Sequence, residues 1–402
     1  MNKKTLVIVG GGAAGFFAAA NLDASKYEII ILEQGFDVLQ KVKISGGGRC
    51  NVTNATFDPR DLVKKYPRGE KELRSVFAKF QPADTMDWYI SRGVDLKIEE
   101  DGRIFPESNS SQSIINCLLQ EVDKRNVSIQ TKTVVKEIAK TNEGYILETS
   151  KGQIAANIVV FTPGSSQKTL KIIENLGHSL VPSFPSLFTF NIKDPILESL
   201  PGTSFTDVEV SIPSIPVKEY GPLLITHWGL SGPAILKLSA WKAIELAKMD
   251  YRFSLEVNFI STSTSEAIEL VKQYKQDNPK KSIGQAKIFP ITSRFWLKVL
   301  ETLSVDSSKQ MANLSKAEIT NICKTLTSKS LSVHGKSTYK DEFVTAGGVS
   351  LKEIDFKNMT SKLLDDFYLA GEVLNIDAIT GGFNFQACWS EAWLIAQHLN
   401  SQ

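Results

Sequence analysis

The sequence predicts an α/β protein with a Rossmann-like nucleotide-binding fold, and three observations support this prediction. Residues 6–9 form a short apolar stretch of the buried-strand type, which leads into the glycine-rich turn 10–15 and then into a helix-forming stretch. A second apolar strand, residues 28–32, ends at the acidic residue Glu33, eighteen residues beyond Gly15. Strand and helix patterns alternate to about residue 180, stop, and return near residue 341. The chain therefore reads as a nucleotide-binding domain that carries an insertion.

The first glycine turn has the spacing of a pyrophosphate-binding loop. Gly10 permits the tight turn, Gly12 lets the backbone approach a pyrophosphate, and Gly15 lets the helix pack closely on the strand. The helix N-terminus presents N–H groups and a partial positive charge to the phosphates. Glu33 is expected to accept a hydrogen bond from a ribose 2′-hydroxyl. Two competing interpretations are a secretory signal, which leaves Glu33 unexplained, and a βαβ turn without a ligand.

Composition narrows the class of protein. The 402 residues suffice for two or three domains, and the hydrophobic (42%) and charged (22%) shares are those of a globular chain. The net charge is +2 without a dense Lys/Arg block, so we expect a small-molecule substrate and no nucleic-acid or membrane partner. The four cysteines are scattered without a CxxC pair, which predicts no metal site and makes the cytoplasm the default location. Nothing indicates an oligomeric state.

The organisation along the chain predicts four segments. Residues 1–185 form the first part of the nucleotide-binding domain, and residues 343–402 form its C-terminal part. Eight of the fifteen prolines lie between Pro182 and Pro233 among alternating apolar stretches, so residues 186–263 and 329–342 are expected to form an inserted β-domain, a small β-barrel or a sandwich. Residues 264–328 are charged and helix-patterned. The expected helices are 111–123, 167–176, 265–276, 293–302, 316–326 and 384–399, and the expected strands are 127–130, 134–139, 145–149, 154–161, 206–212, 253–259 and 367–370.

A second glycine-rich segment, residues 41–54, lacks both helical and strand periodicity. Gly46, Gly47 and Gly48 stand in succession between Ser45 and Arg49, which would let the backbone fold tightly around a phosphate or a ring. Backbone N–H groups in such a nest bind anions, and Arg49 could add a charge-assisted hydrogen bond. The alternative is a flexible surface loop.

The third segment lies near the C-terminus. A buried strand ends at Gly371 and Glu372, a loop contains Asp377, and the pair Gly381–Gly382 opens the last helix. The N–H groups of that helix could meet a partially negative ring carbonyl, and Gly371 with Glu372 could contact a ribityl or phosphate group. Taken alone, the segment could also be a plain strand–loop–helix connection.

Together, these motifs make the chain resemble the flavoproteins of the YhiN/BaiN type, which include aminoacetone-oxidase-like and bile-acid-reductase-like members. The resemblance rests on residues 10–15, 44–51, 102–106, 226–234, 345–349 and 371–386, and it covers essentially the whole chain. One departure is the segment 161–167, where similar proteins carry Ala-Thr-Gly-Gly and a longer loop. Pro163 removes one backbone donor there, which would alter the ring pocket or the approach of a second nucleotide.

The resemblance implies FAD bound in a two-dinucleotide-binding-domain type fold with an inserted β-barrel and a small helical domain. It also implies that Val135 contacts the adenine side through its backbone. The full set of expected FAD-binding residues is Gly10, Gly12, Ala13, Ala14, Gly15, Glu33, Gln34, Lys41, Ser45, Gly46, Gly47, Gly48, Arg49, Asn51, Val135, Thr162, Gly164, Gly371, Glu372, Asp377, Gly381, Gly382, Phe383 and Asn384.

The expected activity is FAD-dependent oxidoreduction, in which hydride moves between a small organic substrate and flavin N5, with NAD(P)H as the electron partner. Two alternatives stay open: an amine oxidase that uses oxygen, and a flavin-binding protein without turnover. An RNA-modifying enzyme is disfavoured because no basic stripe stands out. His227 is the candidate catalytic acid or base, although it could instead fix its own turn by a hydrogen bond. Cys50 is expected to be a packing residue, and Arg103 either binds an anion or forms a surface ion pair.

Overall fold

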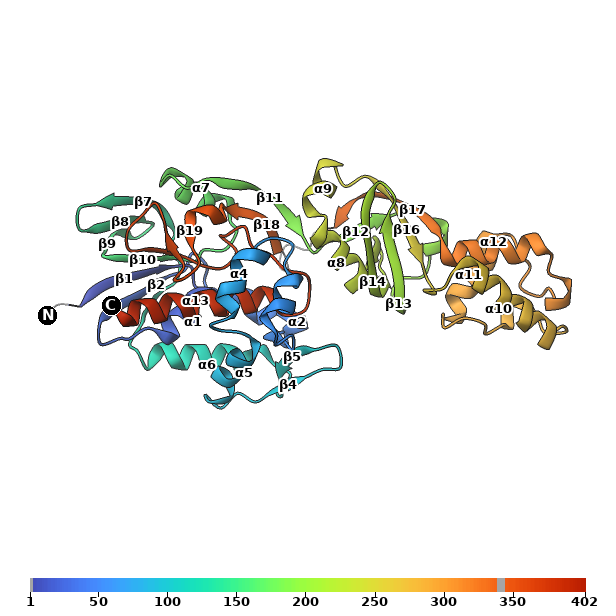
Figure 1. The fold of residues 1–402 in the computed structure, drawn as a ribbon, viewed down its shortest axis with the longest axis horizontal. Helices are drawn as coiled ribbons and strands as arrows, with labels where there is room; N and C mark the ends of the chain where they lie inside the picture. Colours follow the sequence, from blue (N-terminus) through green and yellow to red (C-terminus); the bar gives the residue numbers. More distant parts are fainter. Residues whose placement is uncertain (1–2, 338–343) are drawn as a thin grey trace. The chain divides into compact units, whose positions relative to one another are not determined.

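The computed structural model describes residues 3–337 and 344–402, and the chain divides into two compact units (Figure 1). The first unit comprises Met1–Pro185 and Lys340–Gln402, and the second comprises Ser186–Tyr339. The expected return to the nucleotide-binding domain at residues 341–343 lies outside the described residues.

The first unit is built on a seven-stranded sheet in the order β19-β20-β21-β10-β1-β2-β6. Adjacent strands from β21 to β6 run parallel, with Val9 beside Phe161 and beside Leu32. Their carboxyl ends therefore share one edge, where open α/β sheets bind ligands. This confirms the predicted Rossmann-like fold. The strands are β1 (Lys4–Val9), β2 (Tyr27–Leu32), β6 (Ser128–Gln130), β10 (Ile158–Phe161), β19 (Ile354–Asp355), β20 (Thr360–Ser361) and β21 (Phe367–Leu369).

Two central helices, α1 (Ala13–Asn21) and α13 (Phe383–Ser401), pack side by side (Figure 1). Both are apolar on several faces, because a helix enclosed by other elements has little surface to present to water. The Phe17 ring of α1 lies 5.1 Å from the Trp389 ring of α13 and 4.6 Å from the Trp88 ring. Aromatic packing thus fixes the helix that carries the first glycine turn.

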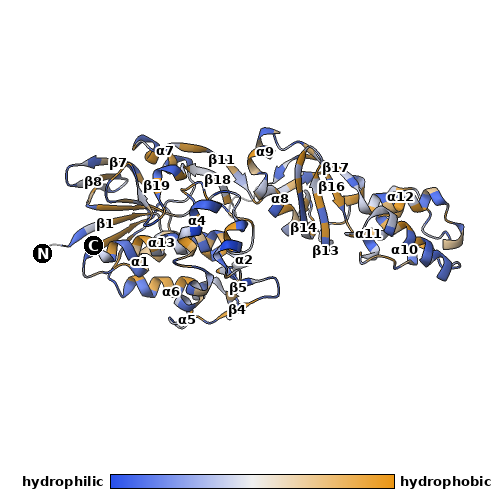
Figure 2. Cartoon of the chain, viewed as in Figure 1, coloured by the Kyte–Doolittle hydropathy of each residue, from blue (hydrophilic) through white to orange (hydrophobic). Residues whose placement is uncertain are grey.

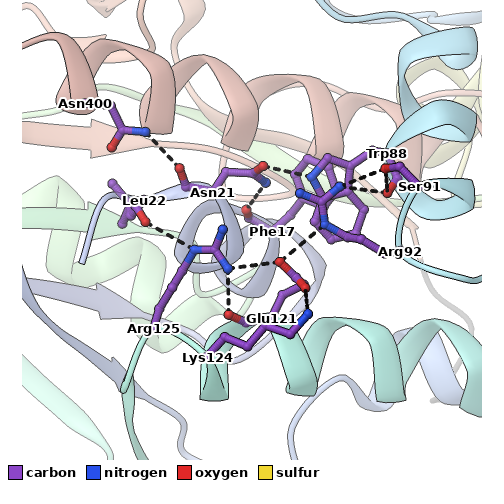
Figure 3. A network of polar contacts seen from close by, with 10 residues as sticks. All are labelled: Phe17, Asn21, Leu22, Trp88, Ser91, Arg92, Glu121, Lys124, Arg125 and Asn400. Atoms are coloured by element: carbon purple, nitrogen blue, oxygen red, sulfur yellow. Dashed lines mark hydrogen bonds and ion pairs between the residues drawn. The ribbon is translucent and has the colours of Figure 1, made fainter. Parts of the chain in front are cut away.

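A buried polar network anchors the other end of α1 (Figure 3). Glu121, only 6% exposed, accepts ion pairs from Arg92 (3.3 Å), Lys124 (2.6 Å) and Arg125 (3.0 Å). Burial alone would raise the pKa of Glu121, but hydrogen bonds from Lys124 and Arg125 hold it below its usual value. Arg125 also donates to the carbonyl of Leu22, just beyond α1 (3.2 Å). The network therefore ties α1 to α6 (Ser111–Asp123) and α5 (Pro82–Ile90).

Two predictions for the first unit are corrected. Residues 40–48 form α2 (Gln40–Gly48), in which Ser45, Gly46 and Gly47 leave helical geometry, so the expected irregular loop begins with a helical turn. The expected strand 154–161 is two strands in different sheets, β9 (Gly152–Ala156) and β10. Asn157 separates them because its side chain accepts the N–H of Thr5 (2.9 Å), which draws β10 onto β1.

The remaining elements of this unit flank the main sheet. The helices between residues 59 and 90 were not predicted, because the short capped segments there lack a long apolar period. The elements are α3 (Pro59–Leu62), η1 (Val63–Lys65), α4 (Glu70–Phe77), α7 (Gln167–Asn175), η5 (Leu351–Glu353), β3 (Thr53–Asn54), β4 (Leu96–Ile98), β5 (Arg103–Pro106), β7 (Val135–Thr141), β8 (Gly144–Thr149), β11 (Leu180–Ser186) and β18 (Val344–Val349).

The second unit contains the predicted barrel, which is closed in the order β12-β15-β14-β13-β16-β17. Closure pairs every strand edge, and alternate residues of β13 and β16 point inward. The elements are β12 (Thr189–Ile192), η2 (Pro195–Leu197), β13 (Ser204–Ile212), β14 (Ile215–Ile225), β15 (Gly229–Ser231), α8 (Pro233–Trp241), α9 (Ala243–Lys248), β16 (Phe253–Asn258) and β17 (Lys329–Ser337).

A helical part lies between β16 and β17 and shares the core of the barrel. Capping boxes open two of its helices, Ser263 with Glu266 and Ser315 with Glu318, so both starts are encoded locally. Phe295 is fully buried and lies 4.8 Å from the ring of Phe205 on β13. The elements are α10 (Thr264–Asp277), η3 (Ile283–Gln285), α11 (Ser293–Thr302), η4 (Met311–Asn313) and α12 (Lys316–Thr327).

We predict that Phe295→Ala lowers the free energy of unfolding of the second unit by about 3–5 kcal/mol, because it empties a fully enclosed aromatic site. Leu297→Ala on the same helix is the matched control, since Leu297 is 43% exposed and should change stability by less than about 0.5 kcal/mol. Urea titrations followed by tryptophan fluorescence and circular dichroism would measure both. Equal losses in the two variants would contradict a core shared by barrel and helices.

Candidate cofactor site

The carboxyl edge of the parallel sheet carries four of the expected binding residues. Gly10, Glu33 and Thr162 directly follow β1, β2 and β10, and Gly371 lies just beyond β21. Gly10 donates its N–H to the carbonyl of Leu32 (2.8 Å), and Thr162 donates its N–H to the carbonyl of Val9 (2.8 Å). Cross-strand bonds thus hold the chain in place as each strand ends.

The first glycine turn depends on a close backbone approach. Gly10 has φ +107°, and a β-carbon there would overlap the carbonyl oxygen of Thr162. A β-carbon on Gly12 would meet no atom within 4 Å, so the turn opens onto space at that residue. Gly12 is the N-cap of α1 and supplies no capping side chain. The first N–H groups of α1, those of Ala13 and Ala14, therefore have no partner within the helix and face a position suited to an anion.

Glu33 is engaged with the backbone in this structure. Its Oε2 accepts the N–H of Gly11 (2.9 Å), and its Oε1 accepts the N–H of Gly35 (2.6 Å). The carboxylate thereby clamps the first glycine turn to the loop that contains Gln34. Its expected contact with a ribose stays a prediction.

The second glycine segment turns back on itself after α2. Gly46, Gly47 and Gly48 all have positive φ (57°, 68° and 83°), and β-carbons on Gly47 and Gly48 would meet nothing within 4 Å. Arg49, however, pairs with Glu99 (Nη1–Oε1, 2.6 Å) and lies over the ring of Phe105 at 3.9 Å. The positive charge that the sequence led us to expect at the ligand is balanced by Glu99, because a carboxylate fifty residues away folds onto it.

The second and third segments touch one another. Asn54 donates from Nδ2 to the carbonyl of Gly381 (3.0 Å). The side-chain amide of Asn51 accepts the N–H of Gly382 through its oxygen (3.0 Å) and donates through its nitrogen to the carbonyl of Thr53 (3.0 Å). Gly382 has φ +93°, and a β-carbon there would overlap the carbonyl of Thr53. The start of α13 is therefore seated against the 51–54 segment.

The first and third segments also meet. A β-carbon built on Gly371 would lie 3.3 Å from that of Ala14. Lys41 forms an ion pair with Glu372, and Glu372 Oε2 lies 3.9 Å from the β-carbon position of Gly164. All three glycine segments of the sequence, together with the 162–164 turn, thus converge on one region of the first unit.

Two expected binding residues have internal roles. The Asp377 carboxylate is fully buried and forms a two-point ion pair with Arg68. Asn384 accepts the N–H of Ala378 (2.9 Å) and donates to the Ala378 carbonyl (3.3 Å). These side chains shape the loop before α13, and Phe383 opens the helix with its carbonyl bonded by Tyr66 (2.6 Å).

Sequence reasoning missed a buried carboxyl group beside the site. Glu391 on α13 is 0% exposed, and its Oε2 accepts the N–H of Gly371 (2.6 Å). Its Oε1 has no hydrogen-bond partner within the described residues. Burial raises the pKa of Glu391 to about 8. The sequence feature that could have indicated this buried carboxyl group is the position of Glu391 as a single acidic residue in the mostly apolar last helix.

Other candidates are located elsewhere. Val135 begins β7, in a separate three-stranded sheet. His227 is exposed on the β14–β15 turn of the second unit, so its role remains a prediction. Arg103 forms surface ion pairs with Asp101 (2.7 Å) and Glu99 (3.3 Å). Cys50 is fully buried, and burial raises its pKa to about 12, as suits a packing residue.

Across residues 3–337 and 344–402, no cluster of His, Cys, Asp and Glu side chains is arranged to hold a metal ion. In the same residues, none of the helices has the length and apolarity that a bilayer-spanning segment needs.

The arrangement fits FAD. A helix N-terminus without a capping side chain, beside open space at Gly12, can hold a diphosphate, and the exposed backbone at Gly47 and Gly48 leaves room for a further part of a long ligand. Gly381 and Gly382 place a second helix N-terminus against the 51–54 segment. The residues present can therefore bind a dinucleotide along the sheet edge.

Comparison with known proteins identifies the family. The family model described as the HI0933-like protein Rossmann domain matches residues 4–398. Ribosomal RNA dihydrouridine synthase of Escherichia coli (strain K12) is 28% identical, covering 99% of this chain and 98% of the relative. The 3-dehydro-bile acid delta(4,6)-reductase of Clostridium scindens is 25% identical over 96% of this chain and 97% of its own. A flavocytochrome c3 fumarate reductase structure shares the fold, with TM-score 0.50 and 14% identity over 100% of this chain and 78% of that one.

We predict that Glu33→Ala weakens FAD binding by roughly tenfold to a hundredfold, because two backbone N–H groups lose a charged acceptor at the turn. Glu28→Ala, an exposed position on β2, is the matched control. FAD occupancy after dialysis, read from the flavin absorbance, measures the effect. Unchanged FAD occupancy in Glu33→Ala would show that Glu33 does not contribute to FAD binding.

We predict that the stability difference between wild type and Glu391→Gln depends on pH. The protonated carboxyl is favoured in the fold, so its stabilisation is fully present below its ordinary pKa of 4.5 and is lost as pH rises through about 8. Wild-type stability should therefore fall relative to Glu391→Gln across this window, by up to about 1.4 kcal/mol per pH unit. Denaturant titrations from pH 5 to 8.5 measure this, with exposed Glu70→Gln as control. A pH-independent difference would show that Glu391 is ionised in the fold.

Proposed function

The chain belongs to the HI0933-like family of FAD-dependent oxidoreductases, and from this premise we propose that it reduces a carbon–carbon double bond conjugated with a carbonyl group, in a uracil base of ribosomal RNA. The observation that carries the proposal is the end-to-end similarity to a ribosomal RNA dihydrouridine synthase. The match covers 99% of this chain and 98% of the relative, so it is not confined to the nucleotide-binding domain.

The second relative supports the same reaction class. Its name describes reduction of delta(4,6) double bonds in a 3-dehydro bile acid, where the double bonds are conjugated with a ketone. In uracil, the C5–C6 double bond is conjugated with the C4 carbonyl. In the reaction proposed here, hydride would add to C6 of uracil and a proton would add to C5, the carbon next to the C4 carbonyl. Saturation of one conjugated double bond is therefore the shared chemistry.

In the first unit, backbone N–H groups and helix N-termini would bind and orient FAD, and the proposal assigns no charged side chain at the sheet edge a catalytic role. Bound FAD would supply the hydride to the substrate. The N–H groups at the start of α1 would hold its diphosphate, and the helix that begins after Gly382 would present a positive end to the ring. The Gly371 N–H, held by Glu391, and the pair Lys41–Glu372 orient the turn beside them.

The proton requires a separate donor. Cys50 is unsuitable because it is fully buried and its pKa is raised to about 12. We retain His227 as the proposed donor, since it is exposed and a protonated imidazole can give up a proton. NAD(P)H is the proposed reductant, as the sequence led us to expect.

The test uses FAD-loaded full-length protein and ribosomal RNA from cells that lack the gene. Anaerobic incubation with NADPH or NADH should convert specific uridines into nucleosides two hydrogen atoms heavier, detected by mass spectrometry of digested RNA. His227→Gln should slow conversion while leaving FAD content unchanged, because it removes the proton donor only.

Three outcomes would overturn this proposal. Rapid reoxidation of the flavin in air after reduction by an amine would favour the oxidase. Bound FAD that neither nicotinamide nucleotide nor any amine reduces would favour flavin binding without turnover. If NAD(P)H reduces the bound flavin but no uridine in the RNA changes, the protein is an oxidoreductase with a different substrate.

A further inference from the structure

Charge is distributed unevenly along the chain. Residues 278–337 contain ten Lys and Arg against three Asp and Glu, whereas the whole chain contains 46 against 44. The near-neutral total therefore conceals a basic segment, which begins at the end of α10 and runs to the end of β17. Figure 2 shows the end of α10 and the loop after it in blue, the hydrophilic colour.

The few carboxylates in this segment are already engaged. Glu301 pairs with Lys298 (3.1 Å), and Glu318 pairs with Lys309 (2.7 Å). Asp306 caps its own turn through Ser308 (2.7 Å). These contacts leave other lysines of the segment without a carboxylate partner.

Two of those lysines, Lys281 and Lys287, lie against Tyr274, and Lys280 is the sequence neighbour of Lys281. Lys280, Lys281 and Lys287 are exposed, and within the described part of the chain none of them lies in an ion pair. The Lys281 ammonium lies 5.6 Å from the ring centroid of Tyr274. Hydrogen bonding from Lys281, with a further hydrogen bond from the backbone of Lys287, lowers the pKa of the Tyr274 phenol. We call Tyr274, Lys280, Lys281 and Lys287 the Tyr274 cluster.

The backbone beneath the Tyr274 cluster is fixed. The loop after α10 is joined to the start of η4 by backbone hydrogen bonds, so Lys280 and Lys281 project from a tethered segment. The bonds run from Lys281 N–H to the Asn278 carbonyl (3.1 Å), from Met311 N–H to the Lys281 carbonyl (2.8 Å) and from Ala312 N–H to the Pro279 carbonyl (2.9 Å).

One carboxylate stands close in sequence to the cluster. Asp277 ends α10, but its oxygens accept both hydrogen bonds from the Gln273 amide (3.0 and 3.1 Å). It forms no ion pair with the cluster lysines among the described residues. The cluster therefore keeps a net positive charge.

We propose that the Tyr274 cluster binds the phosphate backbone of RNA and holds the ribosomal RNA substrate on the second unit. This inference rests on the proposed function, which supplies the polyanion. Exposed lysines on a fixed loop suit phosphates, and the Tyr274 ring, partly buried and covered by Lys281, does not suit base stacking. The cluster thus positions RNA without selecting its sequence.

The test compares three variants of the FAD-loaded full-length protein. Lys280→Gln/Lys281→Gln/Lys287→Gln removes the charges, and the corresponding triple Lys→Arg variant retains them. The control, Lys4→Gln/Lys71→Gln/Lys357→Gln, removes three exposed lysines from the first unit. Affinity for a labelled single-stranded RNA 30-mer is measured by anisotropy from 50 to 200 mM salt, and FAD content with the thermal midpoint verifies folding.

We expect the Gln triple variant to lose RNA affinity and the slope of log affinity against log salt to fall in magnitude by about 2–3, because roughly 0.7–0.9 is lost per phosphate contact. The Arg triple variant and the control should keep the wild-type slope. An unchanged slope in the Gln triple variant, or an equal loss in the control, would overturn the inference.

The activity assay separates this inference from the proposed function. If wild type reduces uridine in ribosomal RNA and the Gln triple variant does so with unchanged KM, the proposed function stands and the cluster is not the RNA site. If the cluster binds RNA but no uridine is reduced, the RNA surface stands and the proposed substrate reaction fails. Binding to anionic lipid vesicles but not to RNA would overturn the inference and assign the cluster to a membrane surface.

Discussion

The first unit depends on close backbone approach at the carboxyl edge of its parallel sheet. At Gly10 the chain passes so near the carbonyl of Thr162 that no β-carbon fits, and Gly382 has the same constraint against Thr53. Because backbone N–H groups carry no net charge, the site can hold a diphosphate without a cluster of cations. The absence of a β-carbon at Gly10 and Gly382 therefore lets the backbone form this site without relying on charged side chains.

Polar side chains around this edge mainly stabilise the turns. Glu33 binds two N–H groups, Asp377 is buried against Arg68, and Arg49 is paired with Glu99. Each of these contacts satisfies a charge that burial would otherwise penalise. The consequence is a pre-formed binding edge, in which the ligand meets ordered backbone instead of having to order it.

Features that depend on local backbone requirements were predictable from sequence. Helix 111–123 coincides with α6 and helix 293–302 with α11, because both show apolar periodicity and a capping side chain, Ser110 or Thr292, marks the start of each. The three glycine segments were found for the same reason. The partners of Arg49 and Asp377 could not be predicted, since Glu99 and Arg68 are brought to them by the fold, and Asp377 lies 309 residues from Arg68. The break at Asn157 also required knowledge of β1.

The net charge of a whole chain does not indicate whether one of its units can bind a polyanion; the charge of that unit does. A value of +2 averages a basic segment over residues 278–337 with an acidic excess in the rest of the chain. A domain that binds its cofactor through backbone N–H groups needs no excess of Lys and Arg. The net charge of the whole chain therefore hides a local excess in a second unit, such as the one proposed here to bind RNA. The expectation of no nucleic-acid partner followed from that average. Because Lys280, Lys281 and Lys287 are exposed and lack carboxylate partners in the described structure, the local balance favours phosphate binding there.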